Sequence, residues 1–275
     1  MMQQAALTHA EGYISTDRGD LHYLKWGSGH RLLIAFHGYA NTAAIFKPFI
    51  PYLSGLYTIL SIDLPHHGDS TWNNQLPILT ADFVQLVRKA MADLQVHKVS
   101  LLGYSMGGRV CLAIVEAMPA SIDRVALLAS DGLTSDFYPW FFTRTRIGEA
   151  LFTHMLHKPE VYLKLIEWLR RFGIIDESRY KFVMNYIKTP AGRQLLGNVW
   201  PVMSHVDPDR AILREAIKKH QVRMGLFMGK YDRIMPPSKA ERFKRGLDSV
   251  ALFILDKGHR VFDEQNAGEI AKWFL

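Results

Sequence analysis

The stretch Val99-Ser100-Leu101-Leu102-Gly103-Tyr104-Ser105-Met106-Gly107 decides the fold. A short apolar run leads into a Gly-x-Ser-x-Gly pentapeptide, and a helical pattern starts at Met106 and stops before Pro119. The pentapeptide alone is weak evidence, because glycine and serine are common residues. A strand, a tight turn and a helix in direct succession are, however, the setting in which such a serine stands exposed at a strand end. Glycines are required there because the turn strains the serine backbone and brings neighbouring segments close together.

Further apolar runs lie on both sides of this stretch. Their continuous rather than alternating hydrophobicity predicts strands that are buried on both faces of a parallel sheet. With the run before Ser105 they are residues 32–36, 57–62, 99–102, 125–128, 224–228 and 251–255. Two alternating stretches, residues 13–16 and 21–26, flank Asp17-Arg18-Gly19-Asp20 and predict an opening β-hairpin.

Helical patterns separate the apolar runs. The clearest follows Thr80, which is a candidate N-cap, and its apolar residues recur at the spacing of one helix face. They are Phe83, Leu86, Val87, Ala90, Met91 and Leu94. A last helix is expected from about Phe262. Strands that alternate with helices predict a doubly wound α/β fold with right-handed crossovers.

This alternation breaks between about Leu133 and Asp207, where the sequence is helical and aromatic. So long a segment is not a structureless loop in a folded domain. We therefore expect a core formed by residues 1–132 and 208–275 and a helical cap formed by residues 133–207. Ligands bind at the carboxyl ends of strands in open α/β sheets, so a cap there would exclude water. The aromatic residues 137–142 could form the core of the cap or the wall of an acyl pocket.

Three further motifs each follow a predicted strand: His37-Gly38-Tyr39, a Gly-x-x-Asp-x-x-x-Pro motif at residues 229–236, and Gly258-His259. With the turn at Ser105 and the loop at residues 63–70, they resemble the capped α/β-hydrolase superfamily over nearly the whole chain. The order serine, acid, histidine also matches this family. The resemblance implies a mostly parallel eight-stranded sheet with flanking helices and a helical cap.

The resemblance also implies roles for individual residues. Ser105 would be the nucleophile, His259 the base and Asp232 the acid that orients it. In the family, the residue after His-Gly and the residue after the nucleophile donate backbone N–H groups to an oxyanion, which here means Tyr39 and Met106. The supporting positions are His37, Gly38, Gly103 and Gly107. Imidazole, with a reference pKa of ~6.5, is well suited to take the serine proton and return it near neutral pH.

Several residues leave alternatives open. The loop at residues 63–70 departs once from the family pattern Asp-x-Pro-Gly-x-Gly-x-Ser, with His66 at the first glycine. Asp131 is a rival acid, because some family members draw theirs from the strand before it. His66 and His67 lack the spacing of metal ligands and are more typical of surface or supporting groups. Arg144 and Arg146 could contact an anionic substrate group or lie in solvent. We predict neither a metal nor an organic cofactor.

Composition limits the classes of partner. The chain has 275 residues, 48% of them hydrophobic, and a net charge of +7, but its basic residues are dispersed, so we predict no nucleic-acid partner. No apolar run approaches the ~20 residues that span a bilayer. The start lacks the features of a signal peptide, and there is a single cysteine, Cys111. The expected location is the cytoplasm.

The expected function is hydrolysis of a small or medium carboxylic ester, thioester or lactone through an acyl-Ser105 intermediate. Its small-molecule substrate would carry an apolar acyl part. A serine at this position argues against the haloalkane dehalogenases and typical epoxide hydrolases of the same fold, which place an aspartate there. C–C bond hydrolases and lyase-type synthases use the same triad, and Arg109 gives a weak local similarity to the 2-succinyl-cyclohexadiene-carboxylate synthases. A ligand receptor that retains the triad is a further alternative. The sequence leaves oligomeric state open.

Overall fold

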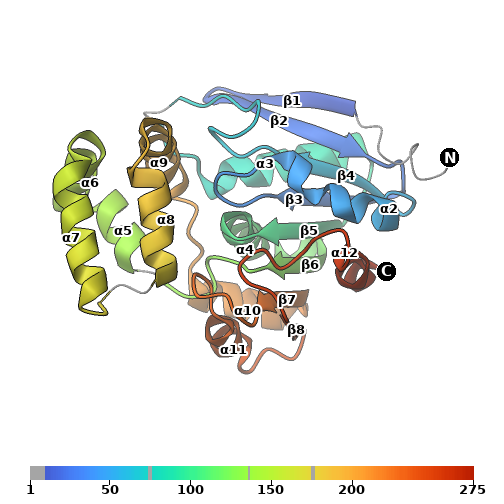
Figure 1. The fold of residues 1–275 in the computed structure, drawn as a ribbon. Coiled ribbons are helices and arrows are strands. Elements are labelled where there is room, and N and C mark those ends of the chain that lie inside the picture. The colour runs from blue at the N-terminus through green and yellow to red at the C-terminus, as the bar shows by residue number, and fades with distance from the viewer. Residues whose placement is uncertain (1–9, 74–75, 136, 175–176) are drawn as a thin grey trace. The chain divides into compact units, whose positions relative to one another are not determined.

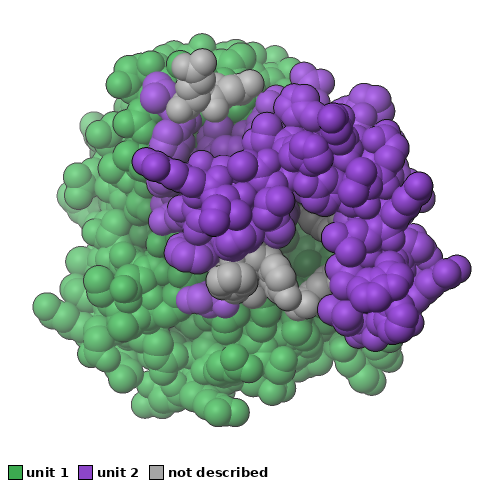
Figure 2. All heavy atoms as spheres, turned by 90° about the vertical axis from the view of Figure 1, so that its left-hand side faces the viewer, with its two compact units in different colours: residues 1–73, 78–134, 206–275 green, residues 74–77, 135–205 purple. Residues whose placement is uncertain are grey.

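The computed structural model describes residues 10–73, 76–135, 137–174 and 177–275. The chain divides into two compact units (Figure 2). The first, called the core unit below, comprises residues 1–73, 78–134 and 206–275, and the second, the helical unit, comprises residues 74–77 and 135–205. No helix among the described residues combines the length and the apolar character needed to cross a membrane.

The core unit is built on an eight-stranded sheet with the strand order β1-β2-β4-β3-β5-β6-β7-β8 (Figure 1). The strands are β1 Ala10–Thr16, β2 Gly19–Trp26, β3 Arg31–Phe36, β4 Tyr57–Ile62, β5 Val99–Tyr104, β6 Ile122–Leu128, β7 Arg223–Gly229 and β8 Val250–Leu255. The pairs β1–β2 and β2–β4 are antiparallel, and the other five pairs are parallel. The predicted mostly parallel eight-stranded sheet is confirmed.

Burial along the strands follows their position in the sheet. Every residue of β4 and β5 is buried, as expected for central strands that are covered on both faces. The prediction was wrong for the last strand, because Phe253 and Ile254 of β8 are 38% and 46% exposed. The physical reason is position: β8 pairs only with β7 and forms the edge of the sheet.

Helices flank this sheet in two groups. The first group consists of η1 Ala43–Phe49, α2 Ile50–Leu53, α12 Ala267–Ala271 and η3 Lys272–Phe274. The second group consists of α3 Thr80–Asp93, α4 Met106–Ala117, η2 Pro119–Ser121 and α10 Arg210–His220. A further helix, α11 Pro237–Lys244, packs on β7 and β8. Leu33 and Ala35 of β3 share a cluster with η1, whereas the ring of Phe36 packs edge-on against Phe83 of α3. Because neighbouring strand residues point to opposite faces, these two groups cover opposite faces of the sheet.

Two predicted helix starts were wrong. Thr80 is the first helical residue rather than the N-cap, because the Asp82 carboxylate reaches back and accepts the backbone N–H of Leu79 at 2.7 Å. The last helix begins at Ala267 rather than near Phe262. Between Phe262 and Ala267 the chain forms a turn instead, in which the Asp263 carboxylate accepts the backbone N–H groups of residues 265 and 266.

The helical unit contains α5 Phe137–Arg144, α6 Arg146–His157, α7 Pro159–Arg171, α8 Glu177–Ile187 and α9 Pro190–Met203. Thr145 and Thr189 cap α6 and α9 by accepting backbone N–H groups from the first turn. The rings of Phe152 and Trp200 stack at 5.6 Å and join these two helices.

Two sets of side chains that the sequence singled out lie in the helical unit. The rings of Phe141 and Phe142 contact each other, whereas the side chains of residues 137–139 lie outside the described ones. Arg146 is exposed, and Arg144 donates to the backbone oxygen of Ser204.

Candidate active site

Ser105 sits at the junction between β5 and α4 in a strained backbone conformation, with φ of 49° and ψ of −115°. Such a conformation costs a non-glycine residue about 1–3 kcal/mol, and it persists only where the surroundings enforce it. Two neighbouring glycines allow the turn. A Cβ on Gly103 would lie 2.7 Å from the Cα of Gly108, and one on Gly107 would lie 1.9 Å from the backbone oxygen of Phe36. The sequence therefore places glycine where the chain has no room for a side chain.

Three side chains from the carboxyl ends of β5, β7 and β8 form one hydrogen-bonded chain. His259 Nε2 lies 3.0 Å from Ser105 Oγ, and His259 Nδ1 lies 2.7 Å from Asp232 Oδ2. The Asp232 carboxylate can only accept hydrogen bonds, so Nδ1 of the histidine carries the proton. Its Nε2 is thereby left as an acceptor for the serine hydroxyl. The structure thus brings together Ser105, Asp232 and His259, which lie far apart in the sequence.

Asp232 is buried, and its carboxylate organises its own loop. Oδ1 accepts the backbone N–H groups of Ile234 and Met235, each at 2.9 Å. The acid loop and the histidine loop come into close contact at Gly229, where a Cβ would lie only 2.0 Å from the backbone oxygen of Gly258. One carboxylate oxygen is therefore committed to the loop, and the other is directed at His259.

The segment after β3, called the 37–43 loop below, runs directly past the serine. A Cβ on Gly38 would lie 3.1 Å from the Cβ of Ser105 and 3.0 Å from the ring of Tyr104, so any larger residue would crowd the turn. Tyr39 follows in this loop. Met106 is the first residue of α4, and backbone N–H groups in a first helical turn have no partner within the helix. The two backbone positions that the sequence singled out for an oxyanion thus belong to two segments that meet at Ser105: the 37–43 loop, which approaches it at Gly38, and the start of α4.

His37 lies fully buried behind this loop. Its Nε2 accepts the backbone N–H of Leu64 at 2.9 Å, so its Nδ1 carries the proton and donates to the backbone oxygen of Gly38 at 2.7 Å. Burial, with a smaller contribution from nearby His67, lowers the pKa of His37 to about 3. The ring is therefore neutral near pH 7 and makes two fixed hydrogen bonds.

The 63–70 loop explains why the family pattern has glycine where this chain has His66. The backbone of His66 has φ of 62°, in the left-handed region that glycine enters freely and other residues enter at a cost of about 1–2 kcal/mol. His67, the next residue, is buried. Its Nε2 accepts the backbone N–H of Ala40 at 3.1 Å, so the 63–70 loop contacts the 37–43 loop through an imidazole ring.

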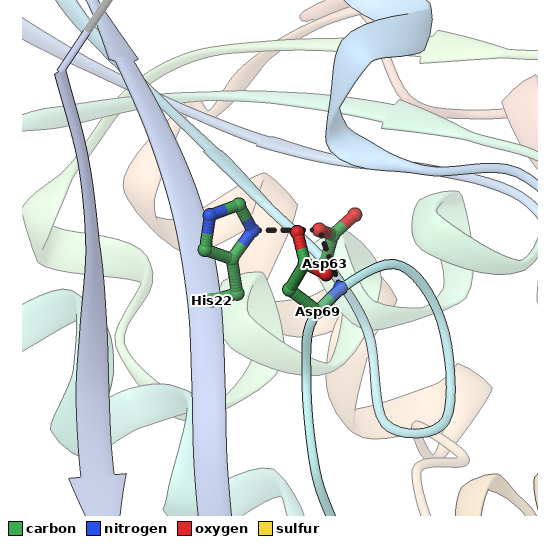
Figure 3. A group of neighbouring side chains, drawn as sticks. All are labelled: His22, Asp63 and Asp69. Atoms are coloured by element: carbon green, nitrogen blue, oxygen red, sulfur yellow. Dashed lines mark hydrogen bonds and ion pairs between the residues drawn. The ribbon is translucent and has the colours of Figure 1, made fainter.

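Asp63 begins this loop, and its side chain and that of His22 were not predicted to take part in the site. Figure 3 shows the ring of His22 directed at the Asp63 carboxylate. Oδ2 of Asp63 accepts from His22 Nδ1 at 2.8 Å and from the backbone N–H of Asp69 at 3.4 Å, and Oδ1 accepts from Ala43 at 2.6 Å. The Asp-x-Pro motif pointed to Asp63, but a lone histidine on a strand gives no signal for His22.

The side chains of His22, Asp63 and Asp69 could also be compared with a metal site, because one potential ligand atom of each lies within 4.8 Å of the others. The hydrogen bonds that these side chains make do not fit a metal site. His22 Nδ1 is protonated and donates to Asp63, and both oxygens of Asp63 already accept from neighbouring groups. These side chains therefore stabilise the 63–70 loop through hydrogen bonds.

The rival acid Asp131 and the single cysteine both lie outside the hydrogen-bonded chain from Ser105 to Asp232. Asp131 accepts the backbone N–H of Gly132 at 2.7 Å and lies 3.5 Å from Arg109, whereas His259 bonds to Asp232. Cys111 is fully buried in α4, and burial raises the pKa of its thiol.

Residues 32–273 match the model of the alpha/beta hydrolase family, so the chain belongs to this family and is a hydrolytic enzyme. The uncharacterized hydrolase YugF of Bacillus subtilis is 27% identical over 240 residues, which cover 86% of each chain. A pimeloyl-[acyl-carrier protein] methyl ester esterase of Neisseria meningitidis is 25% identical over 225 residues, which cover 80% of this chain and 68% of that protein.

Among solved structures, the fold is similar to 2-hydroxy-6-oxo-6-phenylhexa-2,4-dienoate hydrolase from Rhodococcus sp. strain RHA1. The TM-score is 0.65 and the identity 22%, over 97% of this chain and 99% of that one. The predicted family and fold are confirmed.

Proposed function

We propose that this enzyme is a serine hydrolase that cleaves small or medium carboxylic esters, thioesters or lactones through an acyl-Ser105 intermediate. The observation that carries the proposal is the continuous hydrogen-bonded chain from Ser105 through His259 to Asp232, at the carboxyl ends of three strands. The esterase among the sequence relatives supports an ester substrate.

Acylation would begin when His259 Nε2 takes the hydroxyl proton of Ser105 and the serine oxygen attacks the carbonyl carbon. Asp232 stabilises the imidazolium that forms and keeps the ring oriented. The backbone N–H groups of Tyr39 and Met106 stabilise the negative oxygen, where one such donor is typically worth about 3–4 kcal/mol. The protonated His259 then gives its proton to the leaving alcohol or thiol, and the acyl-serine remains.

Deacylation repeats these steps with water as the nucleophile. His259 removes a proton from water, the hydroxide attacks the acyl carbon, and the same two N–H groups stabilise the second oxyanion. Collapse of this intermediate returns the proton to Ser105 and releases the carboxylic acid. Both half-reactions need His259 to exchange protons at Nε2, and the Asp232 hydrogen bond at Nδ1 keeps that atom available.

We propose in addition that residues 133–207 are the helical cap segment of the hydrolase and that its substrate carries an apolar acyl group. Residues 135–205 belong to the helical unit, which leaves the core after β6 and returns before α10. The optimum chain length of the substrate would then report the size of the acyl group that the enzyme accepts.

The test is hydrolysis of p-nitrophenyl esters from acetate to decanoate by the wild type, Ser105→Ala and the control Ser238→Ala, which changes an exposed serine on α11. We expect turnover by the wild type and the control, and a kcat at least about 10³-fold lower for Ser105→Ala. If the wild type hydrolyses no ester although a fluorophosphonate labels Ser105, the ester proposal is wrong and C–C cleavage, synthase or receptor roles take its place.

A further inference from the structure

Three hydrogen bonds between side chains and backbone join the 37–43 loop to the 63–70 loop. Leu64 donates its backbone N–H to His37, Ala40 donates to His67, and Ala43 donates to Asp63, at 2.9, 3.1 and 2.6 Å. The first and third contacts lie at the ends of the 37–43 loop. The contact from His67 lies in its middle, directly after Tyr39.

The peptide between Tyr39 and Ala40 is held at both of its polar atoms. Its N–H donates to Nε2 of His67, and its oxygen accepts from the side-chain amide of Asn41 at 2.8 Å. Ala40 has φ of 56°, a left-handed conformation that is unfavourable for alanine and therefore needs support from its surroundings. Releasing this peptide would let the loop relax and would turn the neighbouring N–H of Tyr39.

The protonation pattern of His67 is fixed by its two contacts. Because Ala40 donates to Nε2, that nitrogen is unprotonated, and the proton on Nδ1 is donated to the backbone oxygen of Pro65 at 2.9 Å. The ring is buried and packs edge-on against the rings of His37 and Tyr39, with centroids 5.0 and 6.0 Å away. Burial lowers the pKa of His67, which favours the neutral form that this arrangement needs.

We propose that His67 is a positioning residue of the oxyanion hole, in which its Nε2 holds the Tyr39–Ala40 peptide so that the N–H of Tyr39 points to the oxygen that becomes negative. The inference rests on the proposed serine hydrolase function. His67 acts through the backbone of the 37–43 loop, so its loss affects the transition state more than substrate binding.

The test compares His67→Asn with His67→Gln. Both replace the ring with an amide, but the glutamine side chain places a hydrogen-bond acceptor near the position of Nε2, whereas the asparagine amide lies near the position of Nδ1. His66→Asn is the matched control, because it changes the adjacent histidine to a residue that accepts its left-handed backbone. Thermal unfolding of each variant checks that the fold is retained.

For His67→Asn we expect a kcat 10- to 100-fold lower, a KM within about twofold of wild type, and a trifluoromethyl ketone inhibitor weakened by the same factor as kcat. His67→Gln should recover most of kcat, and the control should match the wild type. Equal losses in the two His67 variants, or a His67→Asn variant that retains kcat within twofold, would overturn the inference while the hydrolase proposal stands.

The rate at which a fluorophosphonate labels Ser105 is the second readout, because the phosphonyl oxygen occupies the same hole. It decides the role of His67 even if no ester is hydrolysed, a result that would refute only the proposed substrate class. We expect slow labelling for His67→Asn and restored labelling for His67→Gln. Equal labelling of wild type and both variants, or an unreactive Ser105 in the wild type, would overturn the inference.

Discussion

The loop that carries Asp232 is linked to Ser105 through His259, whereas the 37–43 loop passes Ser105 directly, and the two loops are held in different ways. The Asp232 carboxylate accepts N–H groups from residues two and three positions later in the chain, so this loop supports itself. The 37–43 loop depends on partners 20 to 27 residues away in the 63–70 loop, namely the side chains of His67 and Asp63 and the backbone N–H of Leu64. Asp232 is therefore fixed locally, whereas the 37–43 loop is only as rigid as a second loop allows.

The largest effect is expected in the self-supporting loop. Asp232→Asn replaces the carboxylate with an amide that can donate to His259, which favours the wrong tautomer of the imidazole. In triads of this kind the same change costs about 10⁴-fold in kcat. Steady-state kinetics of Asp232→Asn should show this loss, and Asp131→Asn should remain near wild type. A large loss in Asp131→Asn instead would move the acid to that residue.

The free energy of unfolding should depend strongly on the Asp63 carboxylate in the 63–70 loop. Asp63→Ala leaves the buried donors of His22 and Ala43 without their acceptor, and each such group costs about 1–3 kcal/mol. Urea unfolding should therefore show a free energy of unfolding lower by about 3 kcal/mol. Asp69→Ala, which changes an exposed side chain in the same loop, should change it by less than about 0.5 kcal/mol. Similar values for the two variants would show that the Asp63 carboxylate does not stabilise this loop.

His37 should make the contact between the 37–43 loop and the 63–70 loop sensitive to acid. Its pKa is lowered to about 3 in the folded protein from 6.5, so its stabilising contribution is complete above pH 6.5 and is lost as the pH falls toward 3. Between pH 6.5 and 5 the wild type should lose up to about 2 kcal/mol more unfolding free energy than His37→Gln, which does not titrate. Parallel pH profiles in chemical denaturation would show that His37 does not contribute.

The smallest effect is expected at Gly38, where the 37–43 loop passes Ser105. A methyl group at this position is tight rather than impossible, because its nearest neighbours would lie at 3.0 and 3.1 Å. Gly38→Ala should lower kcat about tenfold by shifting the loop, whereas Gly55→Ala, whose added Cβ meets nothing within 4 Å, is the control. Unchanged esterase kinetics in Gly38→Ala would mean that the loop moves freely without cost.

The contrast between the two loops also explains what the sequence could predict. Ser105, Asp232 and His259 each follow a strand and lie beside glycines that the close approach requires, so local patterns were sufficient to predict that these side chains lie together. His22 and His67 act through partners far away in the sequence, and nothing in their own neighbourhood indicates those contacts.

The wrong predictions also arose because a local sequence pattern does not reveal which contacts a segment makes in the fold. The start of the helix at Thr80 was misjudged because Asp82 reaches back to cap it, and the last helix because Asp263 forms a turn first. The burial of β8 was overestimated because an apolar run does not reveal that a strand lies at the edge of a sheet.

The order of Ser105, Asp232 and His259 along the chain has a consequence for protein synthesis. Ser105 leaves the ribosome well before Asp232 and His259, which follow the last two strands of the sheet. Translation adds about 5–20 residues per second, so for about 8 to 30 seconds the nascent chain contains Ser105 without His259. Under the proposed mechanism the growing polypeptide lacks its base during that time, and hydrolysis can begin only after β8 has joined the sheet.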